Sequence, residues 1–224
     1  MFARDLSVAR YRSFDNYRLA LSDGVTVLAG PNAAGKTNLI EALQLLTSGA
    51  SFRHPTAAEL VHDGVGSCKV ELRLEGDGRV LDMGLSVEDG KRSFSRNGKR
   101  CAASGVRGVL PSVLFCPDHL DMVKRGASVR RTALDDFGVQ LSARYADLAS
   151  AYGRCVTQRN ALLKETWCCR EMLGAWNESI ACAGSALLVH RLALLDRLSG
   201  HVRDAYGRVA SGEPAGVSYV STPV

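Results

Sequence analysis

The sequence predicts a two-part protein, with an α/β domain in its first half and a helical hairpin in its second half. A glycine-rich loop at residues 30–37 lies between a short apolar run and an amphipathic stretch, an order typical of a strand–loop–helix unit. Asp-Gly and Asn-Gly dipeptides then separate short alternating runs, which indicates antiparallel hairpins. Beyond residue 131, apolar residues recur every three or four positions, as they do in amphipathic helices.

The first expected elements are short strands and one helix. Residues 6–8 and 25–29 are bounded apolar runs, and residues 18–21 alternate between apolar and polar side chains. Residues 37–46 place their apolar side chains on one helical face, and Gly49 follows as a helix stop.

The region from residue 68 to residue 101 predicts an antiparallel meander. Its turns coincide with Asp77-Gly78, Asp89-Gly90 and Asn97-Gly98, whose residues tolerate positive φ. The expected strands are residues 69–74, 80–87, 92–95 and 100–101. A further buried strand is expected at residues 109–115.

The second half predicts two long amphipathic helices, one over residues 131–162 and the other over residues 172–206. A junction near residues 166–171 would make them an antiparallel hairpin. Residues 217–220 are typical of the beginning of a strand, so the chain is expected to be cut short there.

The composition is typical of a soluble intracellular protein, with 46% hydrophobic and 23% charged residues. No run approaches the roughly 20 apolar residues of a membrane span, and the N-terminus lacks a secretory signal. The seven cysteines show no metal-ligand spacing. We therefore expect a cytoplasmic protein with reduced thiols and no membrane partner. The net charge of +5 weakly favours polyanions as binding partners.

The glycine-rich loop matches the pattern G-x-x-x-x-G-K-[ST] at every specified position. Gly30 and Gly35 allow the backbone to approach phosphate oxygens closely, and the following helix directs its positive end at the anion. Lys36 supplies a point charge, and Thr37 offers a hydroxyl to Mg²⁺. The loop thus predicts a P-loop NTPase that binds ATP and Mg²⁺. The expected nucleotide contacts are Gly30, Pro31, Asn32, Ala33, Ala34, Gly35, Lys36, Thr37 and Asn38.

Several stretches resemble a known family. Residues 11–14 (YRSF) and 24–42 are similar to the opening of SMC and ABC-type ATPase heads. Residues 47–53 (TSGASFR), 114–124 (LFCPDHLDMVK) and 130–135 (RRTALD) narrow the resemblance to the RecF family of bacterial recombination mediators. Residues 158–164 (QRNALLK) are also similar, and the likeness covers nearly the whole chain.

The resemblance implies an ABC-ATPase-like head that carries a helical arm. It implies residues 1–127 as the head's N-terminal lobe, residues 128–210 as the hairpin arm and residues 211–224 as a return segment. It also implies that Arg12 lies near the nucleotide phosphates. RecF proteins bind DNA in an ATP-dependent way and dimerise around ATP. They act with RecO and RecR at gapped DNA and single-strand/double-strand junctions, where they help RecA to load.

The chain departs from the family pattern in two respects. The family's signature motif and its Walker B acidic pair would lie beyond residue 224, so no complete catalytic set is expected and hydrolysis should be severely impaired. Asp118 and His119 stand where the family has an acidic pair, which weakens the case for a magnesium or water role in that loop.

Four basic residues before the first long helix are candidate contacts for DNA phosphates: Lys124, Arg125, Arg130 and Arg131. Alternatively, Arg131 pairs with Asp135 one helical turn on, or the cluster is a solvated face. Two other functions stay open. One is a truncated ATP-binding interaction module without turnover, and the other is a kinase-like phosphotransferase on the same loop.

Overall fold

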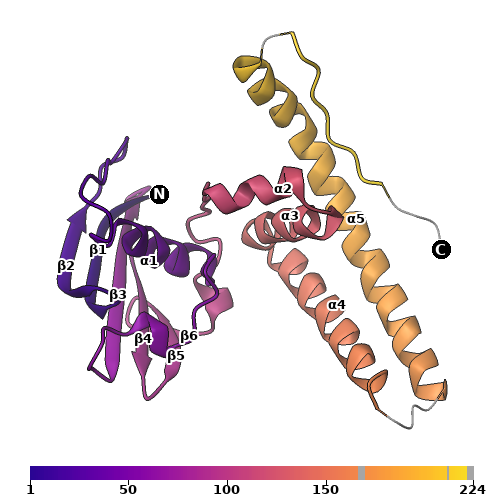
Figure 1. The fold of residues 1–224 in the computed structure, drawn as a ribbon, viewed down its shortest axis with the longest axis horizontal. Coiled ribbons are helices and arrows are strands. Elements are labelled where there is room, and N and C mark those ends of the chain that lie inside the picture. Colours follow the sequence, from indigo (N-terminus) through magenta and orange to yellow (C-terminus); the bar gives the residue numbers. More distant parts are fainter. Residues whose placement is uncertain (166–169, 211, 221–224) are drawn as a thin grey trace. The chain divides into compact units, whose positions relative to one another are not determined.

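The computed structural model describes residues 1–165, 170–210 and 212–220, apart from the side chains of Asp118 and Arg170. The predicted helix junction therefore lies mostly outside the described residues, as do Ser211 and the last four residues of the return segment. The chain divides into two compact units, Met1–Phe115 and Cys116–Val224 (Figure 1).

The first unit is built on a six-stranded antiparallel sheet with the strand order β2-β1-β3-β4-β5-β6. The strands are β1 (Phe2–Tyr11), β2 (Phe14–Ala20), β3 (Ser67–Gly76), β4 (Arg79–Glu88), β5 (Lys91–Arg96) and β6 (Lys99–Cys101). Asp77, Asp89 and Asn97 begin the three hairpin turns with positive φ. The predicted meander and its turns are thus confirmed.

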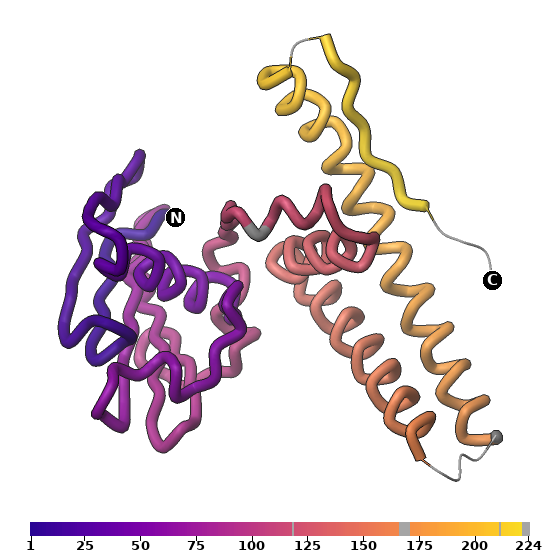
Figure 2. The backbone as a smooth tube through the Cα atoms, viewed as in Figure 1, coloured from indigo at the N-terminus to yellow at the C-terminus, as the bar shows by residue number. Residues whose placement is uncertain are grey.

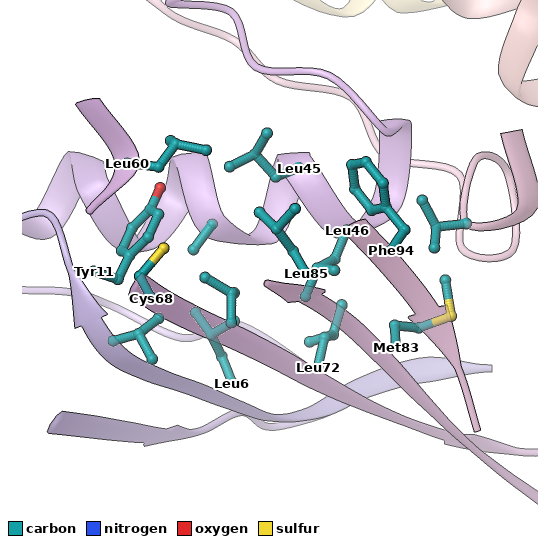
Figure 3. Close-up of a cluster of buried hydrophobic side chains, with 14 of the residues drawn as sticks. Leu6, Tyr11, Leu45, Leu46, Leu60, Cys68, Leu72, Met83, Leu85 and Phe94 are labelled. Carbon is teal, nitrogen blue, oxygen red and sulfur yellow. The ribbon is translucent and has the colours of Figure 1, made fainter. Parts of the chain in front are cut away.

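Helix α1 (Lys36–Ser48) covers one face of this sheet. Figure 3 shows the buried side chains that lie between the helix and the sheet. Alternate residues of β3, beginning at Cys68 and ending at Leu74, point into this core because side chains alternate along a strand. Leu45 and Leu46 of α1 meet them and are fully buried. Gly49 ends the helix in the left-handed conformation, as predicted. Two single turns, η1 (Ala58–Leu60) and η2 (Ala103–Gly105), lie between the larger elements.

Two predicted strands are wrong in this structure. Residues 25–29 and 109–115 form no strand ladder with any part of the chain that the structure describes. Val25 and Val113 are more than four-fifths exposed. An apolar run becomes a strand only where a neighbouring strand accepts its hydrogen bonds, and neither run has such a neighbour here.

The second unit is helical, with η3 (Pro117–Leu120), α2 (Asp121–Lys124), α3 (Ala127–Leu141), α4 (Ala143–Leu162) and α5 (Arg170–Val209). Helices α4 and α5 pack side by side as the predicted hairpin (Figure 2). The single helix predicted over residues 131–162 is wrong, because the backbone of Ser142 is extended and separates α3 from α4. Its hydroxyl accepts a hydrogen bond from the Tyr145 backbone N–H, which caps α4.

A partly buried polar cluster holds this helical unit together. The Asp135 carboxylate of α3 accepts two hydrogen bonds from Arg191 of α5, at 2.9 and 2.6 Å. It also accepts one from the Tyr145 hydroxyl of α4, at 2.6 Å. Gly138 leaves room for the Tyr145 ring, since a Cβ there would lie 2.6 Å from it. One carboxylate therefore ties three helices together.

Helix α5 corrects one expectation from the sequence. Within Glu171–Val209 it has a stretch that is long and apolar enough, by length and composition alone, to cross a membrane. The helix nevertheless carries Arg191 in its ion pair and buries Leu187 and Leu194 against neighbouring helices. Residues 212–220 return alongside α5 as extended chain (Figure 2), and the strand expected at residues 217–220 does not form.

Candidate nucleotide-binding site

The phosphate-loop sequence folds as a tight turn that leads directly into α1. Gly35 precedes the helix with a φ of 86°, in the left-handed region that favours glycine. A Cβ at Gly35 would also lie 2.5 Å from Cζ of Phe14. Both constraints exclude larger residues at this position. Ala33 adopts a φ of 65°, which is a strained value for a residue with a Cβ.

Lys36 folds back over the loop. Its Nζ donates hydrogen bonds to the backbone oxygens of Gly30 and Pro31, at 2.8 and 2.7 Å. These carbonyls hold the ammonium at the mouth of the loop, beside the N-terminus of α1, where the helix dipole also favours an anion. The Thr37 side chain is exposed next to it. An anion that reached this point would meet the lysine charge and the positive end of the helix together.

A buried carboxylate lies behind the loop. Glu41 of α1 is fully buried, and its two oxygens accept a bidentate pair from Arg12, at 3.1 and 2.9 Å. The Ser51 hydroxyl donates to it at 2.7 Å and the Tyr11 hydroxyl at 3.3 Å. Arg53 approaches it at 3.5 Å. Both oxygens of Glu41 therefore have hydrogen-bond partners, which come from two separate segments, residues 11–12 and residues 51–53.

The same cluster continues to the first turn of α1 through Asn38. The Asn38 amide donates to the Ser13 hydroxyl at 3.1 Å and accepts from Arg53 at 2.9 Å. Arg12 and Arg53, which are 41 positions apart in the sequence, are thus both held beside the phosphate loop. The resemblance implied a place near the phosphates for Arg12, and in this structure Glu41 holds its guanidinium.

The ionisation of this cluster follows from its burial. Burial, together with the nearby Glu41 carboxylate, raises the pKa of Tyr11, so the phenol stays protonated and can donate to Glu41. Burial acts to lower the pKa of Arg12, but hydrogen bonds and the charge of Glu41 outweigh it and raise that pKa. The cluster therefore keeps a protonated tyrosine and a charged arginine around one carboxylate.

The sequence missed Glu41, Tyr11 and Ser51. The signal for Glu41 was present, because it falls on the apolar face of α1 between Leu39 and Ala42. An acidic residue on the buried face of a helix needs a charged or hydrogen-bonding partner. Its partners come from β1 and from the segment after α1, a pairing that the helical pattern alone does not reveal.

The four basic residues predicted to contact DNA differ in the contacts that their side chains make within the chain. Arg125 pairs with Asp121 at 2.7 Å, and Arg130 donates to the backbone oxygens of Met122 and Arg125. Lys124 and Arg131 are exposed, and neither has a partner among the residues that the structure describes. Asp135, the alternative partner of Arg131, is paired with Arg191 instead.

Comparison with known proteins agrees with this architecture. A family profile described as an AAA domain matches residues 5–108. The chain is 35% identical to the DNA replication and repair protein RecF of Paenarthrobacter aurescens (strain TC1), over 99% of this chain and 58% of that protein. It is 34% identical to RecF of Beutenbergia cavernae, over 98% of this chain and 59% of that protein.

Two solved structures are similar over almost the whole chain. The recombination mediator protein RecF with ATP, of the RecFOR pathway, superposes with a TM-score of 0.86 at 26% identity, over 99% of this chain and 63% of that chain. The same mediator with ATPrS gives a TM-score of 0.87 at 26% identity, over 95% of this chain and 59% of that chain. This chain is therefore similar to RecF proteins over nearly its whole length, and it spans just under three-fifths of the length of the curated relatives that it matches.

Proposed function

We propose that this chain binds ATP through the phosphate loop, as part of a RecF-type DNA replication and repair protein. The observation that carries the proposal is Lys36, whose Nζ is already held over the loop by the backbone oxygens of Gly30 and Pro31. Phosphate oxygens would replace those carbonyls as acceptors. The similar RecF structures with ATP and ATPrS support this choice of ligand.

Calorimetric titration with ATP tests the loop. We expect Lys36→Ala to abolish measurable binding, because the ammonium is the only formal charge that the loop itself offers to the phosphates. Lys164→Ala removes an exposed lysine of the helical unit and serves as the control. Equal affinities for Lys36→Ala and the control would refute the assignment.

We infer that Mg²⁺ is held between the Thr37 hydroxyl and the phosphates of the nucleotide. The described residues contain no cluster of three His, Cys, Asp or Glu side chains that could hold the ion, so the protein's contribution would be this hydroxyl, with water completing the shell. Thr37→Val should weaken ATP binding in the presence of Mg²⁺ and leave it unchanged in EDTA. A loss of equal size in both conditions would contradict this role.

We further propose that the chain acts on DNA. The names of its relatives and the pathway of its structural neighbours support a role in DNA replication, repair and recombination. The resemblance to RecF proteins implies that this role lies at gapped DNA and junctions, with RecO-type and RecR-type partners, RecA loading and an ATP-dependent homodimer, in the cytoplasm. Lys124 and Arg131 are the two candidates with side chains free to contact phosphates. Replacing both by glutamine should make duplex binding less sensitive to salt, and an unchanged salt dependence would remove them from the interface.

A further inference from the structure

The positive charge of the chain is concentrated in one short segment. Residues 90–117 contain six basic and no acidic residues. Without these six, the chain has 22 basic residues against 23 acidic ones, so the rest of the molecule is nearly neutral. A segment that holds the entire positive excess of a protein is a candidate binding surface for a polyanion.

Five of the six basic residues lie in the hairpin formed by β5 and β6, and hydrogen bonds fix the position of its turn. Asn97 and Gly98 both have positive φ, at 49° and 75°, which gives a tight two-residue turn. The Asn97 backbone N–H donates to the Asp82 carbonyl at 2.7 Å, and the Asp82 backbone N–H donates to the Asn97 side chain at 2.9 Å. The tip is thus fastened to β4, and little conformational entropy would be lost when a ligand binds there.

Three of the six charges are free at this tip. Arg92 donates to the Pro55 carbonyl, and Arg107 donates to the Ser48 carbonyl at 3.2 Å. Lys91 lies at the other end of β5, opposite Glu88 in the ladder. The three free side chains, at the tip, are exposed and have no hydrogen-bond acceptor within the described part of the chain. They are Arg96, Lys99 and Arg100.

The arrangement of these three residues is unfavourable for the free protein. Arg96 and Lys99 are direct cross-strand partners, and like charges in this position repel each other. Arg100 pairs with Ser95 and projects from the opposite face, so positive charge surrounds the turn on both sides. The Arg96–Lys99 pair does not stabilise the fold, so its presence needs another explanation. An anion placed between the two side chains would relieve their repulsion.

Protection of a sheet edge is the alternative explanation, since β6 is an edge strand and lysines often blunt such edges. The other edge strand, β2, argues against it. Strand β2 carries one basic and one acidic residue, Arg18 and Asp15, and has no net charge. An edge of this sheet is therefore tolerated without a cationic excess.

We propose that the tip of the β5–β6 hairpin binds the sugar–phosphate backbone of duplex DNA through Arg96, Lys99 and Arg100. The proposal rests on the DNA-binding function proposed above and gives it a place on the head. The contact is to phosphates, so it adds affinity without base specificity.

Fluorescence anisotropy of a labelled short duplex, measured over a series of salt concentrations, tests the proposal. The hairpin variant is Arg96→Gln/Lys99→Gln/Arg100→Gln. The matched control is Lys164→Gln/Arg203→Gln/Arg208→Gln, which removes three exposed positive charges from the helical unit. The hairpin variant should make the negative slope of log K against log salt shallower by about 2–3, since each phosphate contact in a duplex contributes roughly −0.9. The control should change the slope little, and both should retain ATP binding.

The possible outcomes separate the two proposals. If the wild-type chain does not bind duplex DNA, both fail. If the wild type binds and the hairpin variant keeps the wild-type slope, the hairpin proposal alone fails. An equal drop in the control overturns it as well, because the effect then reflects only net charge. Should the triple variant fold poorly, the three single glutamine variants replace it in the same measurement. Each should make the slope of log K against log salt shallower by about 1.

Discussion

At the residue scale, Glu41 is the side chain on which the candidate site depends most. Glu41→Gln keeps the shape but removes the charge that Arg12 and Arg53 share. We expect the head to lose about 3 kcal/mol in unfolding free energy, the low end for removing one partner of a buried pair, since both arginines reach solvent. Urea denaturation measures this loss. Glu71→Gln, which breaks an exposed pair with Lys69, should cost less than about 1 kcal/mol. Equal losses would mean that Glu41 contributes no more than a surface charge.

Tyr11 gives the same cluster a dependence on pH. Its pKa in the folded state is raised by burial and by Glu41 above the ordinary value of about 10. The stabilisation is therefore complete below pH of about 10 and is lost as the pH rises above that value, because only the unfolded phenol ionises there. Melting temperatures should fall more steeply at alkaline pH for the wild type than for Tyr11→Phe. Parallel curves for the two proteins would contradict this.

At the element scale, Gly138 determines how closely α3 and α4 pack. Gly138→Ala would place its Cβ 2.6 Å from the Tyr145 ring, and such overpacking costs about 1–3 kcal/mol. Gly153→Ala in α4 is the matched control, since a Cβ there meets nothing within 4 Å. It should stabilise the helix by about 0.5–1 kcal/mol. Thermal unfolding followed by circular dichroism distinguishes the two, and a shift of the same sign for both variants would contradict this account of the packing.

Some helices and strands can be predicted from the sequence, and others cannot. The meander was predicted correctly because each Asp-Gly or Asn-Gly turn is a local signal. The strand expected at residues 25–29 failed because a strand needs a partner, which no local pattern reports. The break at Ser142 was missed for a related reason, since apolar spacing continues across it while the backbone does not. In the site, the loop motif was local and visible, whereas the partners of Glu41 come from distant segments.

At the scale of the whole molecule, each compact unit has its own core. The described core of the head gathers residues from Leu6 to Val106, and that of the helical unit centres on Tyr145, Leu187 and Leu194 alone. Stability follows buried apolar area, so the helical unit should be the weaker of the two. Hydrogen exchange should be faster in α5 than in β3 and β4.

Two core substitutions test whether the units unfold separately. Leu45→Ala and Leu187→Ala each remove a side chain that is at most 1% exposed, at an expected cost of about 3 kcal/mol. Because no residue of either described core belongs to the other unit, Leu45→Ala should accelerate hydrogen exchange within Met1–Phe115, and Leu187→Ala within Cys116–Val224. Exchange that rises equally in both units for either variant would show one cooperative unit. ATP should then slow exchange in the first unit most, because the phosphate loop, Lys36 and the Glu41 cluster all belong to it.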